Sequence, residues 1–426
     1  MTTYHFKNFA ENKTMAYVTF FLAASFYLYE YVLQVAPSVM AEPMMRTFHV
    51  TAQGFGIISA FYFYSYAPMQ LPAGVLFDRY GPRKLMTAAL VLCAFGSFFF
   101  AATDHLFTAA LGRFFIGVGS AFSFVGLLIL LSRWFPPYYF AILAGVAQAM
   151  SSVGAIFGEM PLAALVGAVG WRYASFILFF IGLILALLMW VVVRDHPVKP
   201  KKSTTRPRIV EEFQRLVKVC SLWRTWVIGM YAFAIWTPIA VFGSLWGVPY
   251  LQQKYGISVI HASSMCTMIW LGIGFGSPIL GWLSDLLRTR RLALILSAAF
   301  GLVATWFVLY ADFVSMTAMY VALFFYGFGA GGQTVSFAVI NDTIEDELLG
   351  TASGFNNLSV LIGGAIFQPL VGVFLDKVGH FQMVGTKIIY PILSYQKALI
   401  VLPLCFAMAL IVAVFLLKET HPSRGK

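Results

Sequence analysis

Charged side chains are scarce in this sequence. Asp, Glu, Lys and Arg together make up 11% of the 426 residues, whereas hydrophobic residues make up 60%. A water-soluble core cannot bury that much apolar surface, so the composition excludes a soluble globular protein and indicates an integral membrane protein. The formal net charge of +11 does not indicate nucleic-acid binding, because the basic residues lie in short loops between apolar runs.

The sequence also lacks the motifs of metal sites and of nucleotide-driven machines. Its four cysteines, Cys93, Cys220, Cys266 and Cys405, lie in or beside apolar runs and show no C-x-x-C spacing, so neither a disulfide framework nor a metal site is expected. No Walker sequence is present, and ATP is therefore not the expected energy source. We predict a protein that is not an enzyme and has no cofactor.

Long apolar runs are abundant. A helix needs roughly 20 apolar residues to cross a bilayer, and we expect twelve such spans. They cover residues 15–40, 53–77, 83–103, 106–134, 139–168, 171–193, 224–251, 258–284, 291–311, 314–341, 350–375 and 393–417. The predicted fold is an all-α membrane protein with twelve transmembrane helices.

The polar stretch 195–223 divides this chain into two halves. It is expected to be a cytoplasmic linker that contains an amphipathic helix, between an N-terminal six-helix bundle (1–194) and a C-terminal six-helix bundle (224–426). Most Lys and Arg residues lie in the loops on the side of this linker and of both chain ends. Because cytoplasmic loops are enriched in Lys and Arg, both termini are expected to be cytoplasmic. The acidic loop 342–347 departs from this pattern and is expected either to pair with nearby basic loops or to be solvated.

One loop sequence occurs twice, about two hundred residues apart. Residues 74–84 read GVLFDRYGPRK, and residues 281–291 read GWLSDLLRTRR. Both copies keep a glycine, a leucine, an aspartate and a trailing basic pair between two apolar runs. The chain is therefore an internal duplication.

These two loops, together with an Arg113-x-x-x-Gly117-x-Gly119 sequence in the fourth span, resemble the major facilitator superfamily over essentially the whole chain. The resemblance implies two bundles around a central cavity that opens alternately to the two sides. It also implies that the loop charges hold the cytoplasmic side closed. The expected gating residues are Gly74, Asp78, Arg79, Gly81, Arg83, Lys84 and Asp285.

A narrower resemblance comes from residues 29–40 and 59–70. They are similar to the phagosomal nutrient transporters of intracellular bacteria, whose substrates include amino acids and nucleosides, and related carriers handle carboxylate siderophores. The fifth span departs from an antiporter pattern. Antiporters often carry a Gly-Pro motif at this place, whereas here Glu159 follows Gly158 and the proline comes two residues later, at Pro161. This difference argues against a drug-efflux antiporter.

Ionisable groups inside spans are costly unless they face a cavity or a partner, so each is a functional candidate. Three stand out: Glu30 in the first span, Arg113 in the fourth and Glu159 in the fifth. Counting helix rise places Glu30 and Arg113 at similar depth, which allows a contact between them.

Glu30 shares one helical face with Tyr27, Tyr31 and Gln34, and this stripe is expected to face the cavity. A carboxylate that alternates between a cation and dry surroundings can carry protons, so Glu30 and Glu159 are the candidate proton-coupling residues. Arg113 would hold Glu30 ionised or bind a substrate carboxylate. A fixed buried salt bridge between Glu30 and Arg113 is the structural alternative.

The second half has no charge within its span cores, so its substrate contacts should be polar or aromatic. The candidates, with Tyr27, Tyr31, Gln34 and Arg113 of the first half, are Trp236, Trp246, Gln333, Asn356 and Asn357. Packing is an equally ordinary role for membrane aromatics.

The sequence thus predicts a monomeric, multi-pass carrier of the bacterial inner membrane that imports a small polar nutrient with protons. The solute would be amino-acid-like or an organic anion. A siderophore or nucleoside carrier is the alternative, and a non-transporting sensor or a channel is less favoured.

Overall fold

The computed structural model describes residues 12–196, 209–312, 315–378, 382–384 and 387–421, and these residues are almost entirely helical. In the first half the helices are α2 (Lys13–Val35), α3 (Pro37–Thr47), α4 (Ala52–Tyr80), α5 (Pro82–Ala102), α6 (Leu106–Ser120), α7 (Ser123–Trp134), α8 (Pro137–Gly158), α9 (Met160–Val169) and α10 (Trp171–Val192). Part of the predicted linker, residues 197–208, lies outside the described residues, and α11 (Ile209–Ser221) forms most of the remainder.

The second half is built in the same way. Its elements are α12 (Trp223–Pro238), the π-helix η1 (Ile239–Trp246), α13 (Gly247–Tyr255), α14 (Val259–Leu286), α15 (Arg290–Tyr310), α16 (Met316–Ala330), α17 (Gly332–Thr343), α18 (Asp346–Val378), the antiparallel strands β1 (Gln382–Val384) and β2 (Lys387–Ile389), α19 (Ile392–Ala398), α20 (Val401–Ile411) and the π-helix η2 (Val412–Leu416).

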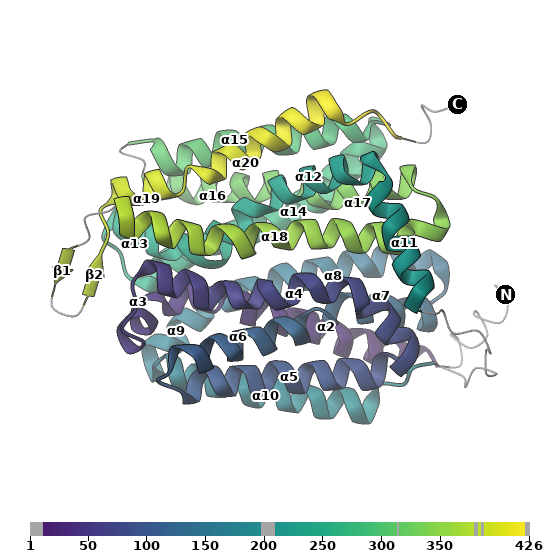
Figure 1. Ribbon diagram of the computed structural model, residues 1–426, viewed down its shortest axis with the longest axis horizontal. Coiled ribbons are helices and arrows are strands. Elements are labelled where there is room, and N and C mark those ends of the chain that lie inside the picture. Colours follow the sequence, from purple (N-terminus) through teal and green to yellow (C-terminus); the bar gives the residue numbers. More distant parts are fainter. Residues whose placement is uncertain (1–11, 197–208, 313–314, 379–381, 385–386, 422–426) are drawn as a thin grey trace.

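The helices of the two halves form two stacked groups (Figure 1). The hairpin β1–β2 projects from one end of the molecule, which we call the outer end, and α11 lies near the opposite, inner end. Helices α4 and α18 pack against each other along the seam between the halves. Glycines permit this approach: a Cβ atom on Gly56 would lie 2.6 Å from the carbonyl oxygen of Gln368, and one on Gly372 would lie 2.3 Å from that of Ala52.

Eleven stretches of the described residues are long and apolar enough to cross a membrane. The predicted second span is the exception among the twelve. It forms the 29-residue helix α4, but its tyrosines, glutamines and two prolines lower its hydropathy. These polar residues and prolines are tolerated because α4 packs against α18 over much of its length, so that only part of its surface faces lipid.

Several spans that we expected to be continuous are interrupted. One helix ends and another begins at Ala36 in the first span, between Ser120 and Ser123 in the fourth, at Glu159 in the fifth and at Gly331 in the tenth. Interrupted helices at the repeat interface are typical of the binding regions of transporters, because they bring polar groups to the middle of the membrane.

Candidate functional site

Glu30 lies on α2 and is completely buried, with 0% of its surface exposed. The hydroxyl group of Tyr62 on α4 donates a hydrogen bond to its Oε1 atom. The Oε2 atom has no hydrogen-bond partner. Glu30 therefore has one oxygen held by a neutral donor and one oxygen available to a proton or another donor.

Arg113 on α6 is also buried, and it is directed at the main chain of the first span. Its Nη1 atom donates to the carbonyl oxygen of Leu33 at 2.6 Å, and its Nη2 atom to that of Gln34 at 3.5 Å. The carbonyl of Leu33 would normally accept from the residue four positions later, but that residue is Pro37, which has no N–H group. Arg113 thus supplies the hydrogen bond that the proline removes.

The predicted direct contact between Glu30 and Arg113 is wrong. No ion pair within 4.0 Å joins these two described residues. Instead, the guanidinium carbon of Arg113 lies 5.0 Å from the ring centre of Tyr62, whose hydroxyl group binds Glu30. Tyr62, which our sequence analysis did not select, links the two charged groups. Its only sequence signal was a place in an aromatic-rich helix, which is equally typical of packing.

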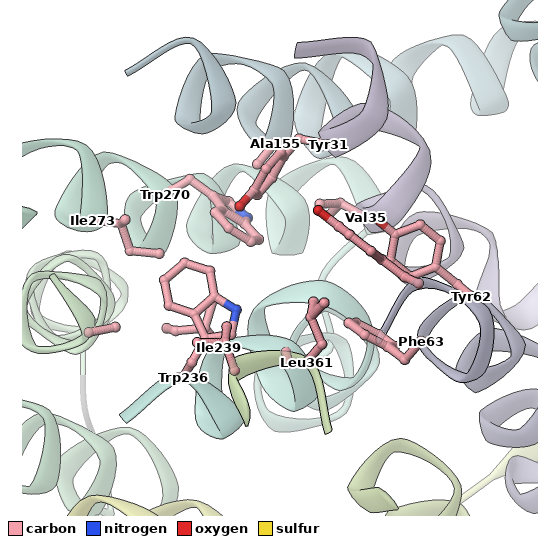
Figure 2. Packing of buried hydrophobic residues seen from close by; sticks show 14 of the residues in the cluster. Tyr31, Val35, Tyr62, Phe63, Ala155, Trp236, Ile239, Trp270, Ile273 and Leu361 are labelled. Atoms are coloured by element: carbon pink, nitrogen blue, oxygen red, sulfur yellow. The ribbon is translucent and has the colours of Figure 1, made fainter. Parts of the chain in front are cut away.

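The polar stripe of α2 faces the second half of the chain. Tyr31 packs edge-on against Trp270 of α14 at 6.0 Å between ring centres, and Gln34 Nε2 donates to Ser244 Oγ of η1 at 3.4 Å. Figure 2 shows Tyr31 beside Trp270, with Trp236 near Trp270 from the second half. Tyr27 instead packs within the first half, 5.0 Å from Phe124. Two side chains of the stripe, Tyr31 and Gln34, thus contact the second half.

The two candidate tryptophans differ in their surroundings. Trp246 is 1% exposed, and its indole N–H donates to the carbonyl of Gln368 at 3.1 Å, so its polar atom is used within the second half. Trp236 is slightly more exposed, at 7%, and lies near Trp270. The environment of Trp246 is that of a packing residue, whereas Trp236 keeps its place among the substrate candidates.

The three candidate amides of the second half lie on α17 and α18. Asn356 Nδ2 donates to Ser336 Oγ at 3.0 Å. Asn357 Nδ2 donates to Gln70 Oε1 at 2.9 Å, across the seam between the halves. Gln333 is 6% exposed, and neither atom of its amide has a partner.

Glu159 lies at the break between α8 and α9. It is fully buried, Ser38 Oγ donates to its Oε1 atom at 3.4 Å, and its Oε2 atom has no partner. Like Glu30, it is a buried acid held by one hydroxyl group, without a cation beside it among the described residues.

The loop charges make contacts within their own halves. The N-terminus of α5 is capped by Asp195, which accepts from the backbone N–H of Arg83 at 2.8 Å, and the Arg83 side chain donates to the carbonyl of Trp190. Gly74, Asp78 and Arg79 are exposed, and Asp78 forms no ion pair with another described residue.

In the second copy, Arg290 pairs with Asp285 at 2.5 Å and with Asp342 at 2.9 Å. The expected pairing of the acidic loop is thereby confirmed for Asp342. Closure of the inner end by contacts between the halves stays a prediction.

The outer end, by contrast, is joined across the halves. Asp376 at the end of α18 accepts hydrogen bonds from Thr51 Oγ1 at 2.6 Å and from the backbone N–H of Gln53 at 3.0 Å. Tyr390 donates to Asp376 at 2.5 Å and accepts from the backbone N–H of Ala52 at 3.0 Å. This cluster could not be predicted from the sequence, because nothing local joins residues 51 and 376, which are 325 positions apart.

Comparisons with known proteins agree with this geometry. The family model of the Major Facilitator Superfamily matches residues 15–366 and 237–426. A hexuronate transporter of Bacillus subtilis is 25% identical, over 88% of this chain and 90% of its own length. A protein named as a probable galactarate/D-glucarate transporter of the same organism is 24% identical, over 84% and 86%. The narrower resemblance to phagosomal nutrient transporters stays a prediction.

Among solved structures, a bacterial homologue of the human lysosomal transporter Spinster, in an inward-facing and unoccupied conformation, superimposes with a TM-score of 0.73. It is 15% identical to this chain and covers 94% of it, and the match covers 97% of the homologue. The family match and the shared fold show that this chain belongs to the Major Facilitator Superfamily and is a multi-pass membrane transporter, not an enzyme.

Proposed function

We propose that this chain imports a small organic anion together with protons, across the inner membrane of a bacterium, by alternating access. The relatives reported above are named for hexuronates and for galactarate or glucarate, which are organic acids. A siderophore or nucleoside carrier was the alternative from the sequence, and no contact of the described residues favours it.

The proposed coupling of solute transport to protons rests on the environment of Glu30. Its carboxyl group is fully buried, is held by the hydroxyl group of Tyr62, and has no cation within ion-pair distance among the described residues. A buried acid in these surroundings can hold a proton and release it when the site opens to water. Tyr62 also touches the guanidinium of Arg113, so a change in the protonation of Glu30 acts on the hydrogen bonds that support the bend at Pro37.

Arg113 has a supporting role in this scheme. Its Nη1 and Nη2 atoms donate to carbonyls of the first span, and its buried Nε atom has no partner. Because the two terminal nitrogens are engaged by the main chain, the geometry favours a positioning residue over a bidentate ligand for the substrate carboxylate. Glu159, with Ser38, is the second candidate for proton binding, at the break in the fifth span.

Purified protein in proteoliposomes tests this function. We expect wild-type protein to exchange labelled galactarate or hexuronate for unlabelled solute, and to accumulate it when a pH gradient is applied. Glu30→Gln should keep exchange and lose accumulation, because the amide keeps the size of the side chain but cannot carry a proton. The exposed Glu347→Gln is the matched control and should keep both. Full gradient-driven accumulation by Glu30→Gln would rule out Glu30 as the proton carrier.

A further inference from the structure

Three polar side chains at the break of the tenth span form a cluster that we call the amide site: Gln333, Ser336 and Asn356. All three are at least nine-tenths buried, with 6%, 1% and 1% of their surfaces exposed. Gln333 and Ser336 lie three residues apart on α17 and therefore share a face, and Asn356 reaches Ser336 from α18.

The hydrogen bonds fix the orientation of the Asn356 amide. Ser336 Oγ donates its single proton to the main-chain carbonyl of Gln333 at 2.7 Å, so it can only accept from Asn356. The Nδ2 atom of Asn356 must therefore face Ser336, which leaves Oδ1 as a free acceptor. The orientation thus follows from the network and not from an arbitrary choice between nitrogen and oxygen.

The amide site has unused donors and acceptors together. Gln333 Oε1 and Asn356 Oδ1 are acceptors without a partner, and Gln333 Nε2 is a donor without a partner. Buried polar groups are normally hydrogen-bonded, and an orphaned group calls for an explanation. Gln333 lies about one turn from Ser336 on α17, and Asn356 contacts Ser336 from α18. The three unpartnered atoms thus belong to neighbouring side chains and indicate a place where a ligand completes the network.

The site also lies at the seam between the halves. Asn357, next to Asn356, donates to Gln70 of α4, and Gln70 Nε2 in turn donates to the carbonyl of Ala121 at 3.5 Å, at the break of the fourth span. A row of polar contacts thus runs from one interrupted central span to the other. Counted along the helices from their inner ends, Glu30 lies about 10 Å farther outward than this row, which is comparable to the length of a small organic acid.

We infer that Gln333 and Asn356 bind a hydroxyl group of the transported solute, which is therefore a hydroxylated organic acid such as a sugar acid. This inference rests on the proposed transport of an organic anion. A hydroxyl group both donates and accepts, so it satisfies an amide oxygen and an amide N–H at once. A carboxylate or sulfonate only accepts, and an ammonium group only donates. Either would leave one kind of amide atom unpaired, and burying an unpaired group weakens binding.

The test compares two dicarboxylates of equal length, galactarate and adipate, which differ by the hydroxyl groups that adipate lacks. Proteoliposomes that contain wild-type protein should exchange labelled galactarate, and unlabelled acids should inhibit this exchange by competition. The inhibitory concentration of galactarate should be at least about tenfold lower than that of adipate. Gln333→Leu and Asn356→Leu should bring this ratio close to one, because they remove hydrogen bonds that adipate never makes. Ser336→Ala, a smaller change, should reduce the ratio part of the way.

Gln368→Leu is the matched control, because it removes another buried amide from the same helix as Asn356, whose Nε2 donates to the carbonyl of Ala240 and whose Oε1 also has no partner. Gln368 lies about 18 Å from Asn356 along α18 and is therefore outside the amide site. This variant should keep the ratio even if it lowers stability. An unchanged ratio in Gln333→Leu, Asn356→Leu and Ser336→Ala, or equal competition by the two acids in wild-type protein, would overturn the amide site while leaving organic-anion transport intact. If wild-type protein exchanged neither acid nor a hexuronate, the proposed function itself would fail, and the site with it.

Discussion

The guanidinium group of Arg113 lies against the main chain of the first span, with its Nη1 atom 2.6 Å from the carbonyl oxygen of Leu33. That carbonyl is the one that Pro37 leaves without its usual N–H partner. An arginine on α6 therefore completes the hydrogen bonding of a bend on α2. Pro37 lies about two turns beyond Glu30, and Leu33 about one turn beyond it. Arg113 and the proton-binding candidate Glu30 therefore act on the same segment of the first span.

This relationship predicts that the effects of Arg113 and Pro37 on stability are coupled. Arg113→Gln should lower the free energy of unfolding by about 1–3 kcal/mol, because it leaves the Leu33 carbonyl unpaired. Pro37→Ala restores an N–H group at the right position, so in the double variant most of this loss should disappear. Thermal unfolding of the four proteins in detergent measures the coupling as a double-mutant cycle.

Arg172 offers a matched control for that cycle. Its side chain also donates to main-chain carbonyls, those of Ala101 and Thr103, but far from Pro37. Arg172→Gln should destabilise to the same extent whether or not Pro37 is replaced. If Arg113→Gln also lowered the free energy of unfolding by the same amount with and without Pro37→Ala, Arg113 would not compensate for the proline.

Gly74, one of the expected gating residues, should be needed for the movement of the two halves during transport. It should not be needed for the stability of the conformation in this structure. A Cβ atom at Gly74 would meet nothing within 4 Å, so Gly74→Ala should stabilise this conformation by about 0.5–1 kcal/mol through chain entropy. If the inner end closes by close approach of helices at this loop, the same variant should slow exchange of solute.

Two further glycines show whether that result is specific. Gly167 also has open space around it, and Gly167→Ala should leave exchange unchanged. Gly117 packs so closely that a Cβ atom would lie 2.1 Å from the carbonyl of Tyr62, and Gly117→Ala should cost about 1–3 kcal/mol of stability. Normal exchange by Gly74→Ala would argue against closure at this loop.

Local patterns were enough to predict the fold. Long apolar runs and two copies of one loop sequence indicated a duplicated membrane protein, and the family match confirms the resemblance that they carried. The same reasoning selected Glu30, Arg113 and Glu159 as charges inside spans, and all three are buried. Burial of this kind can be predicted because a charged side chain that faces lipid is costly, so an ionisable residue within a span faces the protein interior or a cavity.

Pairing between spans could not be predicted in the same way. Equal depth suggested that Glu30 meets Arg113, but depth does not fix the rotation of a helix, and Tyr62 lies between them. Pro37 did carry a usable signal, since a proline within a helical segment leaves the carbonyl four residues earlier without its backbone N–H partner. Thr51 and Asp376 are 325 residues apart, and only the packing of α4 on α18 brings them together.

Stability should depend on pH through Glu419, which follows the last helix. Burial alone would raise the pKa of Glu419, but hydrogen bonds from Thr289 and from the backbone N–H groups of His421, Arg290 and Arg291 outweigh it and lower the pKa to about 2. The pKa of an unfolded glutamate is about 4.3. Because the folded-state pKa is the lower one, this stabilisation is complete above about pH 5 and is lost as the pH falls through about 2.

The variant Glu419→Gln checks this sign. Near neutral pH its melting temperature should lie below that of wild-type protein, and the gap should narrow as the pH falls below about 4, where wild-type Glu419 begins to lose its advantage. Glu347→Gln, on an exposed side chain, should show no such trend. A gap that stays constant down to about pH 3 would contradict the role of the carboxylate.

The last prediction concerns the outer end, where Asp376 joins the halves. Its carboxylate binds Thr51 and the start of α4, and Tyr390 bridges it to the backbone of Ala52. These contacts must break when the outer end opens, whereas Asp78 at the inner end of α4 has no ion pair with another described residue. Asp376 therefore favours the outward-closed state.

Asp376→Asn removes the charge but keeps the shape of the side chain. Losing a charge-assisted hydrogen bond costs about 1.5–3 kcal/mol, which would shift the equilibrium toward the outward-open state by about tenfold to a hundredfold. Spin labels at the exposed positions 49 and 383, one in each half, should then report a population with a longer distance. Tyr390→Phe removes only the bridging hydroxyl group and should shift the population less. If neither variant changed the distance distribution, packing of the glycines along α4 and α18 would have to be what keeps the outer end closed.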